Sequence, residues 1–495
     1  MNGHLTDSQR NAHPLPPRNP RGSSRRAKRP TARVALACAL APSVLAPALL
    51  APFVCASPAH AAAPKSSGSA GGAVLEARYN LGDQAFHPPA SLGYQGDGEL
   101  AATVYYPAAL GDGRHPVVLM QHGSWETCAD ASAAADRARA EKARDQARER
   151  GDKAEEARQD ALVEKASDKL WAWPCAPGIK EIPSREGYDY LGRALAAKGF
   201  VVVSVGANGI NATAGGQADT VYQARAALID EHLRLWQRLV RSGDGPLRGA
   251  LKAAKTGAPV TTSFRDRLDM GRVGLLGHSM GGGGVMQEIA DDHRSAWPEG
   301  VDIKAAFALA PTATWDNEPV TRTPFAVMWG TCDEVNTGSF FEQNRAAARV
   351  PVYKYTLTGG NHAFYNRQWS PSSGQVASRD DAMPGARPGT CLSQFPDRDQ
   401  PQREQPRLAE GEQRLLTTNR VTAFFERFLE NRTDRDAYLS GARPFPGEPK
   451  KTVTTAFTTG TTGTTGTTGK ASTAAGTAGT AAGTAGTAAS EAEQR

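Results

Sequence analysis

The residues best placed to do chemistry lie in the stretch Gly277-His278-Ser279-Met280-Gly281, where a serine stands between two glycines. A short apolar run, Val273–Leu276, precedes it and indicates a buried strand, and we expect a helix over Val285–Ala290. G-x-S-x-G between a strand and a helix is the pattern of a sharp, strained turn that presents a serine hydroxyl as a nucleophile. We therefore predict that Ser279 is a nucleophile, although a glycine-rich turn with an incidental serine has the same pattern.

A serine nucleophile needs two partners, because its hydroxyl is weak at its free pKa. A base must take its proton, and an acid must orient the base. With this turn the chain order is Ser, then Asp or Glu, then His, each on a loop after a strand. Asp333 follows one expected strand and His362 follows the next, and His362 is the only histidine after Asp333. The sequence predicts a triad of Ser279, His362 and Asp333, with Glu334 as a second candidate for the acid.

An oxyanion intermediate needs N–H donors aimed at the position where negative charge develops. The amide of Met280, directly after the nucleophile, is one candidate, and the amide of Ser124, in the motif His122-Gly123-Ser124-Trp125, is the other. Trp125 and Trp315 are candidates for an aromatic wall against the substrate, or for simple packing. The predicted chemistry needs no metal and no organic cofactor, and the chain lacks C-x-x-C and H-x-x-x-H spacings.

The elements that must position these residues alternate along the chain. Strands alternating with amphipathic helices imply a mostly parallel sheet covered by helices on both faces. Besides Val273–Leu276, the expected strands are Ala73–Leu81, Glu99–Tyr106, the run from Pro116 to the His122 motif, Phe200–Val205, Ile303–Leu309, Pro324–Trp329 and Val352–Leu357. Besides Val285–Ala290, the expected helices are Tyr188–Lys198, Ala224–Arg241 and Arg414–Leu429.

One segment does not follow this alternation. Ala129–Lys169 consists largely of alanine and of charges of both signs, and it begins an insertion, residues 129–183, after the third strand. Ala, Glu, Lys and Arg are strong helix formers, and opposite charges recur at helical spacing, so we expect helix. The insertion is either a solvated helical decoration or a lid or docking arm over a cleft.

The N-terminal residues predict export. Arg21–Arg33 is basic, Val34–Ala56 is apolar, and Ala59-His60-Ala61 has the small-x-small pattern of a cleavage site. A membrane anchor is the alternative, but three prolines interrupt the apolar run. We expect a signal peptide over residues 1–61, cleaved near Ala61, and a secreted protein without stable membrane insertion.

The rest of the chain divides into a linker (62–72), one α/β domain (73–445) and a Thr/Gly/Ala-rich tail (446–495) that we expect to be disordered. The tail is a candidate spacer or glycosylated stalk that could associate with a cell wall.

The net charge of +6 belongs to the leader, because residues 1–61 hold eight of the 57 basic residues and one of the 51 acidic ones. The remainder carries 49 basic and 50 acidic residues, which argues against nucleic acid as a partner.

Four of the six cysteines lie beyond the leader: Cys128, Cys175, Cys332 and Cys391. An even number in an exported chain favours two disulfides, with three possible pairings. We favour Cys128–Cys175, which closes the insertion, and Cys332–Cys391, which ties together two loops near the site.

With these motifs the chain resembles the secreted bacterial α/β-hydrolases around cutinases, polyester hydrolases and dienelactone-hydrolase-like esterases. The resemblance covers roughly residues 73–440 and is carried by the elbow with its glycine run, residues 277–284, and by Ile303–Pro311. It implies the α/β-hydrolase fold and triad roles for Ser279, Asp333 and His362. It is also consistent with a disulfide between Cys332 and Cys391.

The chain also departs from these cutinases. Ser124 stands where they carry an aromatic residue, residues 129–169 have no counterpart in them, and residues 206–211 and 361–366 differ from theirs. These departures argue against polyester turnover but not against ester hydrolysis.

The sequence thus predicts an exported serine esterase that acts on small or polymeric carboxylic esters. An alternative keeps the triad but takes acetylated polysaccharide, lipid or peptide as substrate. Another is a non-catalytic surface or binding protein on a hydrolase scaffold.

Overall fold

The computed structural model describes residues 72–215, 217–314, 319–336, 339–375, 387, 389–393, 403–449 and 452–460. Its strands alternate with helices, as the sequence predicts. The strands are β1 (Val74–Asn80), β2 (Ala101–Pro107), β3 (His115–Gln121), β4 (Val201–Val205), β5 (Lys252–Ala253), β6 (Leu268–His278), β7 (Ile303–Leu309), β8 (Phe325–Gly330), β9 (Val352–Leu357), β10 (Thr390–Leu392), β11 (Glu404–Pro406) and β12 (Val453–Thr458).

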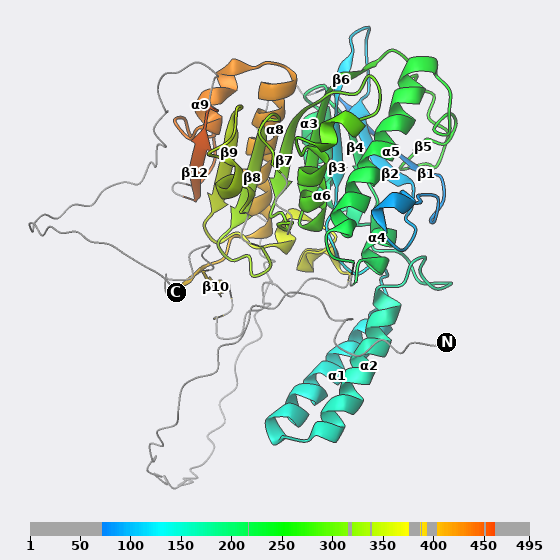
Figure 1. Ribbon diagram of the computed structural model, residues 1–495, viewed down its shortest axis with the longest axis vertical. Coiled ribbons are helices and arrows are strands. Elements are labelled where there is room, and N and C mark those ends of the chain that lie inside the picture. The colour runs from blue at the N-terminus through cyan, green and yellow to red at the C-terminus, as the bar shows by residue number, and fades with distance from the viewer. Residues whose placement is uncertain are drawn as a thin grey trace, which may run out of the picture. The chain divides into compact units, whose positions relative to one another are not determined.

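A ten-stranded sheet runs through the described part of the chain in the order β12-β9-β8-β7-β6-β3-β4-β2-β1-β5 (Figure 1). The six strands from β4 to β9 in this order are mutually parallel, and the strands at both edges pair antiparallel. The sheet is therefore mostly parallel, as expected. In a parallel sheet the loops at the carboxyl ends of the strands meet along one edge, where ligands bind in folds of this type.

Helices cover both faces of the sheet. Successive strand residues point to opposite faces and so contribute to two separate apolar clusters, one beneath each layer of helices. Val117 and Leu119 of β3 lie in one cluster, and Val118 and Met120 lie in the other. The first cluster includes residues of α5 (Thr220–Ser242) and α6 (Met280–Glu288), and the second includes residues of α3 (Asp189–Ala196) and α8 (Glu410–Leu429). The shorter helices are α4 (Asn208–Thr213), α7 (Phe340–Asn344) and α9 (Asp436–Leu439).

The insertion is helical, as expected, and it forms two helices rather than one segment. α1 (Ala131–Arg150) and α2 (Lys153–Leu170) are joined by a turn at Gly151, whose φ is 73° (Figure 1). The two helices lie side by side and antiparallel, and Arg148 pairs with Glu156 at 2.8 Å across the turn between them. The buried residues of α1 are all alanines, seven positions apart: Ala133, Ala140 and Ala147. Because the buried residues of α1 are small alanines, its sequence shows no stripe of large apolar side chains.

The predicted start of the tail at residue 446 is too early. β12 (Val453–Thr458) lies inside that range and pairs antiparallel with β9 as an edge strand of the sheet. Its threonines, valine and phenylalanine fit a half-buried strand, because β-branched and aromatic residues favour strands. This strand was missed in the sequence because its threonine-rich composition resembles that of the repeats after it.

The expected signal peptide, nearly all of the expected linker and most of the expected tail lie outside the described residues. Among the residues that the structure describes, no helix is both long and apolar enough to cross a membrane.

Candidate functional site

Ser279 occupies a strained turn between β6 and α6, where its φ is 57° and its ψ is −125°. A positive φ in a residue other than glycine is uncommon and is maintained only where the surroundings impose it. A side chain at Gly277 would collide with the backbone of Gly281, and one at Gly281 would collide with the carbonyl oxygens of Gln121 and His122. The two glycines of the motif therefore allow the turn to be this tight. The helix begins at Met280, earlier than expected, so the glycine run is itself helical.

The loop after β3 packs directly on the nucleophile candidate. A Cβ at Gly123 would lie 2.5 Å from the Cβ of Ser279 and 2.6 Å from the carbonyl oxygen of His278. Ser279 as a whole is only 4 % exposed, whereas the turn pattern predicts an openly presented serine. The close approach of this loop contributes to the burial of Ser279.

The two expected oxyanion donors flank this contact. Met280 is the first residue of α6, and the first N–H groups of a helix have no acceptor within the helix. Ser124 follows Gly123 and is half-buried. Both amides therefore belong to segments that adjoin the side chain of Ser279.

A buried hydrogen-bond network holds the β3 loop in place. The imidazole of His122 donates from Nδ1 to the carbonyl of Gly123 at 2.8 Å and accepts the N–H of Ala207 at Nε2, also at 2.8 Å. A ring that donates from one nitrogen and accepts at the other is neutral, and burial lowers the pKa of His122 to about 3. The fully buried Arg225 of α5 donates to the carbonyl of His122 at 2.9 Å. These supporting residues were not predicted from the sequence.

The acid and base candidates form a buried pair. Oδ2 of Asp333 lies 2.9 Å from Nδ1 of His362, and the two residues are 1 % and 7 % exposed. The other carboxylate oxygen accepts the N–H groups of Val335 at 2.8 Å and Asn336 at 2.9 Å, which fixes its direction. Glu334 is exposed. The geometry therefore favours Asp333 over Glu334 as the partner of the imidazole.

Backbone contacts hold the acid loop against the base loop. The N–H of Thr331 donates to Leu357 at 2.9 Å and that of Cys332 donates to Gly360 at 2.8 Å. A side chain at Gly330 would collide with the carbonyl of Gly360, so glycine is required at that crossing.

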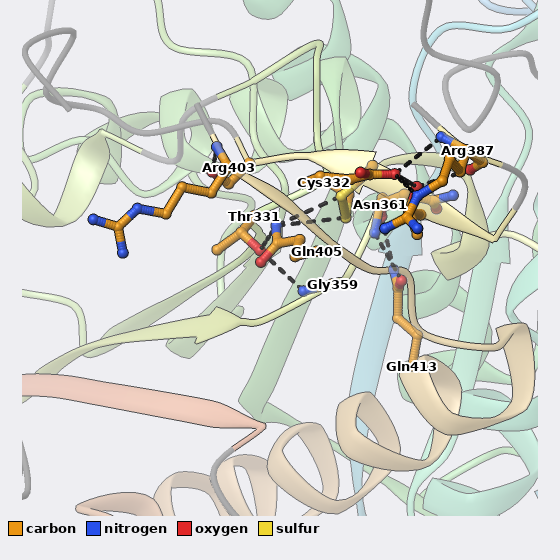
Figure 2. The surroundings of a disulfide bond; sticks show 12 residues. Thr331, Cys332, Gly359, Asn361, Arg387, Arg403, Gln405 and Gln413 are labelled. Atoms are coloured by element: carbon orange, nitrogen blue, oxygen red, sulfur yellow. Dashed lines mark hydrogen bonds and ion pairs between the residues drawn. A yellow bond between two sulfur atoms is a disulfide. The ribbon is translucent and has the colours of Figure 1, made fainter. Parts of the chain in front are cut away.

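Side chains complete the connection between the two loops (Figure 2). Figure 2 shows Gln405 of β11 donating to the hydroxyl of Thr331 at 2.7 Å, and the N–H of Gly359 donating to the same hydroxyl at 2.9 Å. Gln413 of α8 accepts the N–H of Asn361 at 2.9 Å and donates to its carbonyl at 2.8 Å. The histidine loop is thereby fixed at the residue before His362.

Both expected disulfides are present. Cys332 is bonded to Cys391, directly beside Asp333, and Cys128 is bonded to Cys175, across the insertion. The two pairings favoured among the three alternatives are therefore confirmed.

Aromatic rings connect the base to the elbow. The ring of His278, the residue before Ser279, lies 4.9 Å from the ring of His362 between centroids. The ring of Trp369 also lies 4.9 Å from that of His278, and Trp125 lies 6.2 Å from Trp369. His362 thus lies beside the nucleophile turn, and Trp125 lies next to the same aromatic cluster. Trp315 is outside the described residues.

No protein-family model matches this chain, and no curated protein matches its sequence. The assignment of a function therefore depends on the geometry of the site.

Proposed function

We propose that this protein is an exported serine esterase with an α/β-hydrolase fold, in which Ser279, His362 and Asp333 hydrolyse carboxylic esters through an acyl-enzyme. The observation that carries the proposal is the buried Asp333–His362 pair, whose imidazole packs beside the ring of His278, the residue before a serine at positive φ. The strand order, with a mostly parallel sheet and the turn between β6 and α6, supports the fold assignment.

The chemistry follows from the orientation of the imidazole. Asp333 engages Nδ1 of His362, which leaves Nε2 to take the proton of Ser279 as its oxygen attacks the ester carbonyl. The resulting oxyanion accepts the N–H groups of Met280 and Ser124, and one such donor is worth about 3 kcal/mol of transition-state stabilisation. Nε2 then protonates the departing alcohol as the C–O bond breaks. Water, deprotonated by the same nitrogen, releases the acid and restores the serine.

The proposal explains features that a non-catalytic scaffold would not need. Holding Ser279 in its strained conformation costs on the order of 1–3 kcal/mol, and three glycines are required around it. Burying a carboxylate beside an imidazole carries a further desolvation cost. These costs coincide at one place, which is expected where strain and pre-organised charge serve a reaction.

Export is proposed together with the activity. Two disulfides are typical of proteins that fold in an oxidising compartment. The basic and apolar leader of the sequence supplies the second argument.

The test is hydrolysis of p-nitrophenyl esters, from acetate to palmitate, by the protein without residues 1–61. We expect turnover that Ser279→Ala abolishes. Ser242→Ala, which removes an exposed hydroxyl at the end of α5, serves as the matched control and should leave the rate unchanged. Turnover that survives Ser279→Ala would refute the assignment. Acetylated polysaccharide and peptide substrates, assayed in parallel, separate the alternative substrates of the same triad.

A further inference from the structure

Three side chains outside the triad meet between the two helices that cover one face of the sheet. Asp230 lies in the middle of α5, Glu288 is the last residue of α6, and His293 begins the 3-10 helix His293–Ala296. Nε2 of His293 lies 3.1 Å from Oε2 of Glu288 and 3.8 Å from Oδ2 of Asp230. One ligand atom from each residue lies within 4.8 Å of the others.

The two carboxylates are buried, His293 is partly buried, and all three groups are poorly satisfied. Glu288 is 0 % exposed and Asp230 is 4 % exposed. Within the described part of the chain, neither carboxylate oxygen of Glu288, nor Oδ1 of Asp230, nor Nε2 of His293 has a hydrogen-bond partner. His293 approaches Glu288 at 3.1 Å without the geometry of a hydrogen bond. Buried carboxylates are normally paired, hydrogen-bonded or bound to a metal.

The nearest chargeable nitrogen is that of His293 itself, which lies in ion-pair range of both carboxylates. Arg234 approaches Oδ2 of Asp230 at 3.5 Å from a half-exposed position, and it contacts Glu231 at the same distance. Among the described residues, Glu288 is paired with no lysine or arginine, and His293 is its one ion-pair contact.

We propose that Asp230, Glu288 and His293 bind one divalent transition-metal ion of the zinc or manganese class. Oxygen and nitrogen ligands about 2.0–2.1 Å from a tetrahedral ion are roughly 3.3 Å apart, and the separations of 3.1 Å and 3.8 Å bracket that value. The imidazole nitrogen favours zinc over calcium and magnesium, which take oxygen ligands, and the two carboxylates also suit manganese. The remaining coordination positions are filled by water.

The ion is structural rather than catalytic. α6 runs from Met280 to Glu288, which at 1.5 Å per residue separates the ion from Ser279 by about 13 Å. The ion fastens the end of α6 to α5, at the opposite end of the helix from the nucleophile. The inference is independent of the proposed esterase activity.

The ligands come from three separate elements, so no spacing motif in the sequence marks them. The sequence-based expectation that the chain has no metal site depended on such motifs. It does not extend to residues that only the fold brings together.

The test uses the untagged protein after dialysis against EDTA and then metal-free buffer. Titration with Zn²⁺, Mn²⁺ and Ca²⁺ is followed by calorimetry and by the thermal unfolding midpoint, and Co²⁺ is added as a spectroscopic probe. We expect one Zn²⁺ or Mn²⁺ per chain, a higher midpoint, and visible d–d absorption with Co²⁺.

Glu288→Gln and His293→Gln should each weaken binding at least 100-fold. The matched control is His87→Gln, because His87 forms an exposed pair with Asp97 at 2.7 Å. It should leave affinity unchanged. The proposal is overturned if no ion binds, if Ca²⁺ binds better than Zn²⁺ and Mn²⁺, or if affinity survives Glu288→Gln. Should either ligand variant fold poorly, Asp230→Asn provides the same comparison.

Discussion

Gly123→Ala tests whether the contact between the β3 loop and Ser279 controls the reaction. The added methyl would lie 2.5 Å from the Cβ of Ser279 and 3.1 Å from its Oγ, whereas ordinary van der Waals contact begins near 3.4 Å. The loop and the serine must therefore separate by about 0.9 Å at the closest pair. A misplacement of about 1 Å at a reacting centre can lower a rate by roughly 10²-fold.

We expect kcat/KM of Gly123→Ala for a p-nitrophenyl ester to fall about 100-fold, while overpacking lowers the free energy of unfolding by about 1–3 kcal/mol. Gly113→Ala is the matched control, because a methyl there meets no atom within 4 Å. Steady-state kinetics and urea unfolding of both variants separate the two effects. A folded Gly123→Ala protein with the wild-type kcat/KM would refute the claim that this loop and Ser279 form the site.

Three further perturbations test separate parts of the account. Asp333→Asn should lower kcat by roughly 10⁴-fold, as loss of the orienting acid does in other triads. Glu334→Gln, at an exposed position, should change kcat little. Equal effects of the two variants in steady-state assays would contradict the assignment of Asp333 as the acid. Replacing Cys332 and Cys391 by serine removes a disulfide between residues 59 positions apart. The loss of this constraint on the unfolded chain should lower the free energy of unfolding by about 4 kcal/mol. Urea unfolding measures the change, and an unchanged midpoint would contradict the prediction. Burial lowers the pKa of His232 to about 3, while the unfolded chain takes up that proton below about pH 6.5, so stability falls as the pH drops. At about pH 5.5 this group should cost about 1.4 kcal/mol relative to pH 7.5, and His232→Gln should remove that part of the pH dependence measured by urea unfolding.

Hydrophobic periodicity predicted the main scaffold. The predicted strands Ile303–Leu309 and Val352–Leu357 have the bounds of β7 and β9, because each is a largely apolar or β-branched and aromatic run of strand length ended by turn residues. β12 was missed because its residues resemble the low-complexity repeats that follow it. The two-residue strand β5 is too short to carry a periodic signal.

The candidate site was predictable only in its reacting residues. Ser279, Asp333 and His362 follow strands in the order that the turn motif requires, so chain position was informative. The residues that support them carry no such mark. Arg225 is a cation on the apolar face of α5, which is a usable signal because charged residues are rarely buried without a partner. The imidazole of His122 is neutral because its Nε2 accepts the N–H of Ala207. Ala207 lies on a distant loop that only the tertiary structure brings close.

The most direct test of the central claim is covalent labelling with a fluorophosphonate probe, which reacts with an activated serine. Trypsin releases Val273–Arg294, the peptide that contains Ser279, so mass spectrometry of the labelled digest locates the modified residue. The account predicts one label per chain on Ser279, formed much more slowly in His362→Gln. A folded protein that takes no label, or carries it on another serine, would contradict the account.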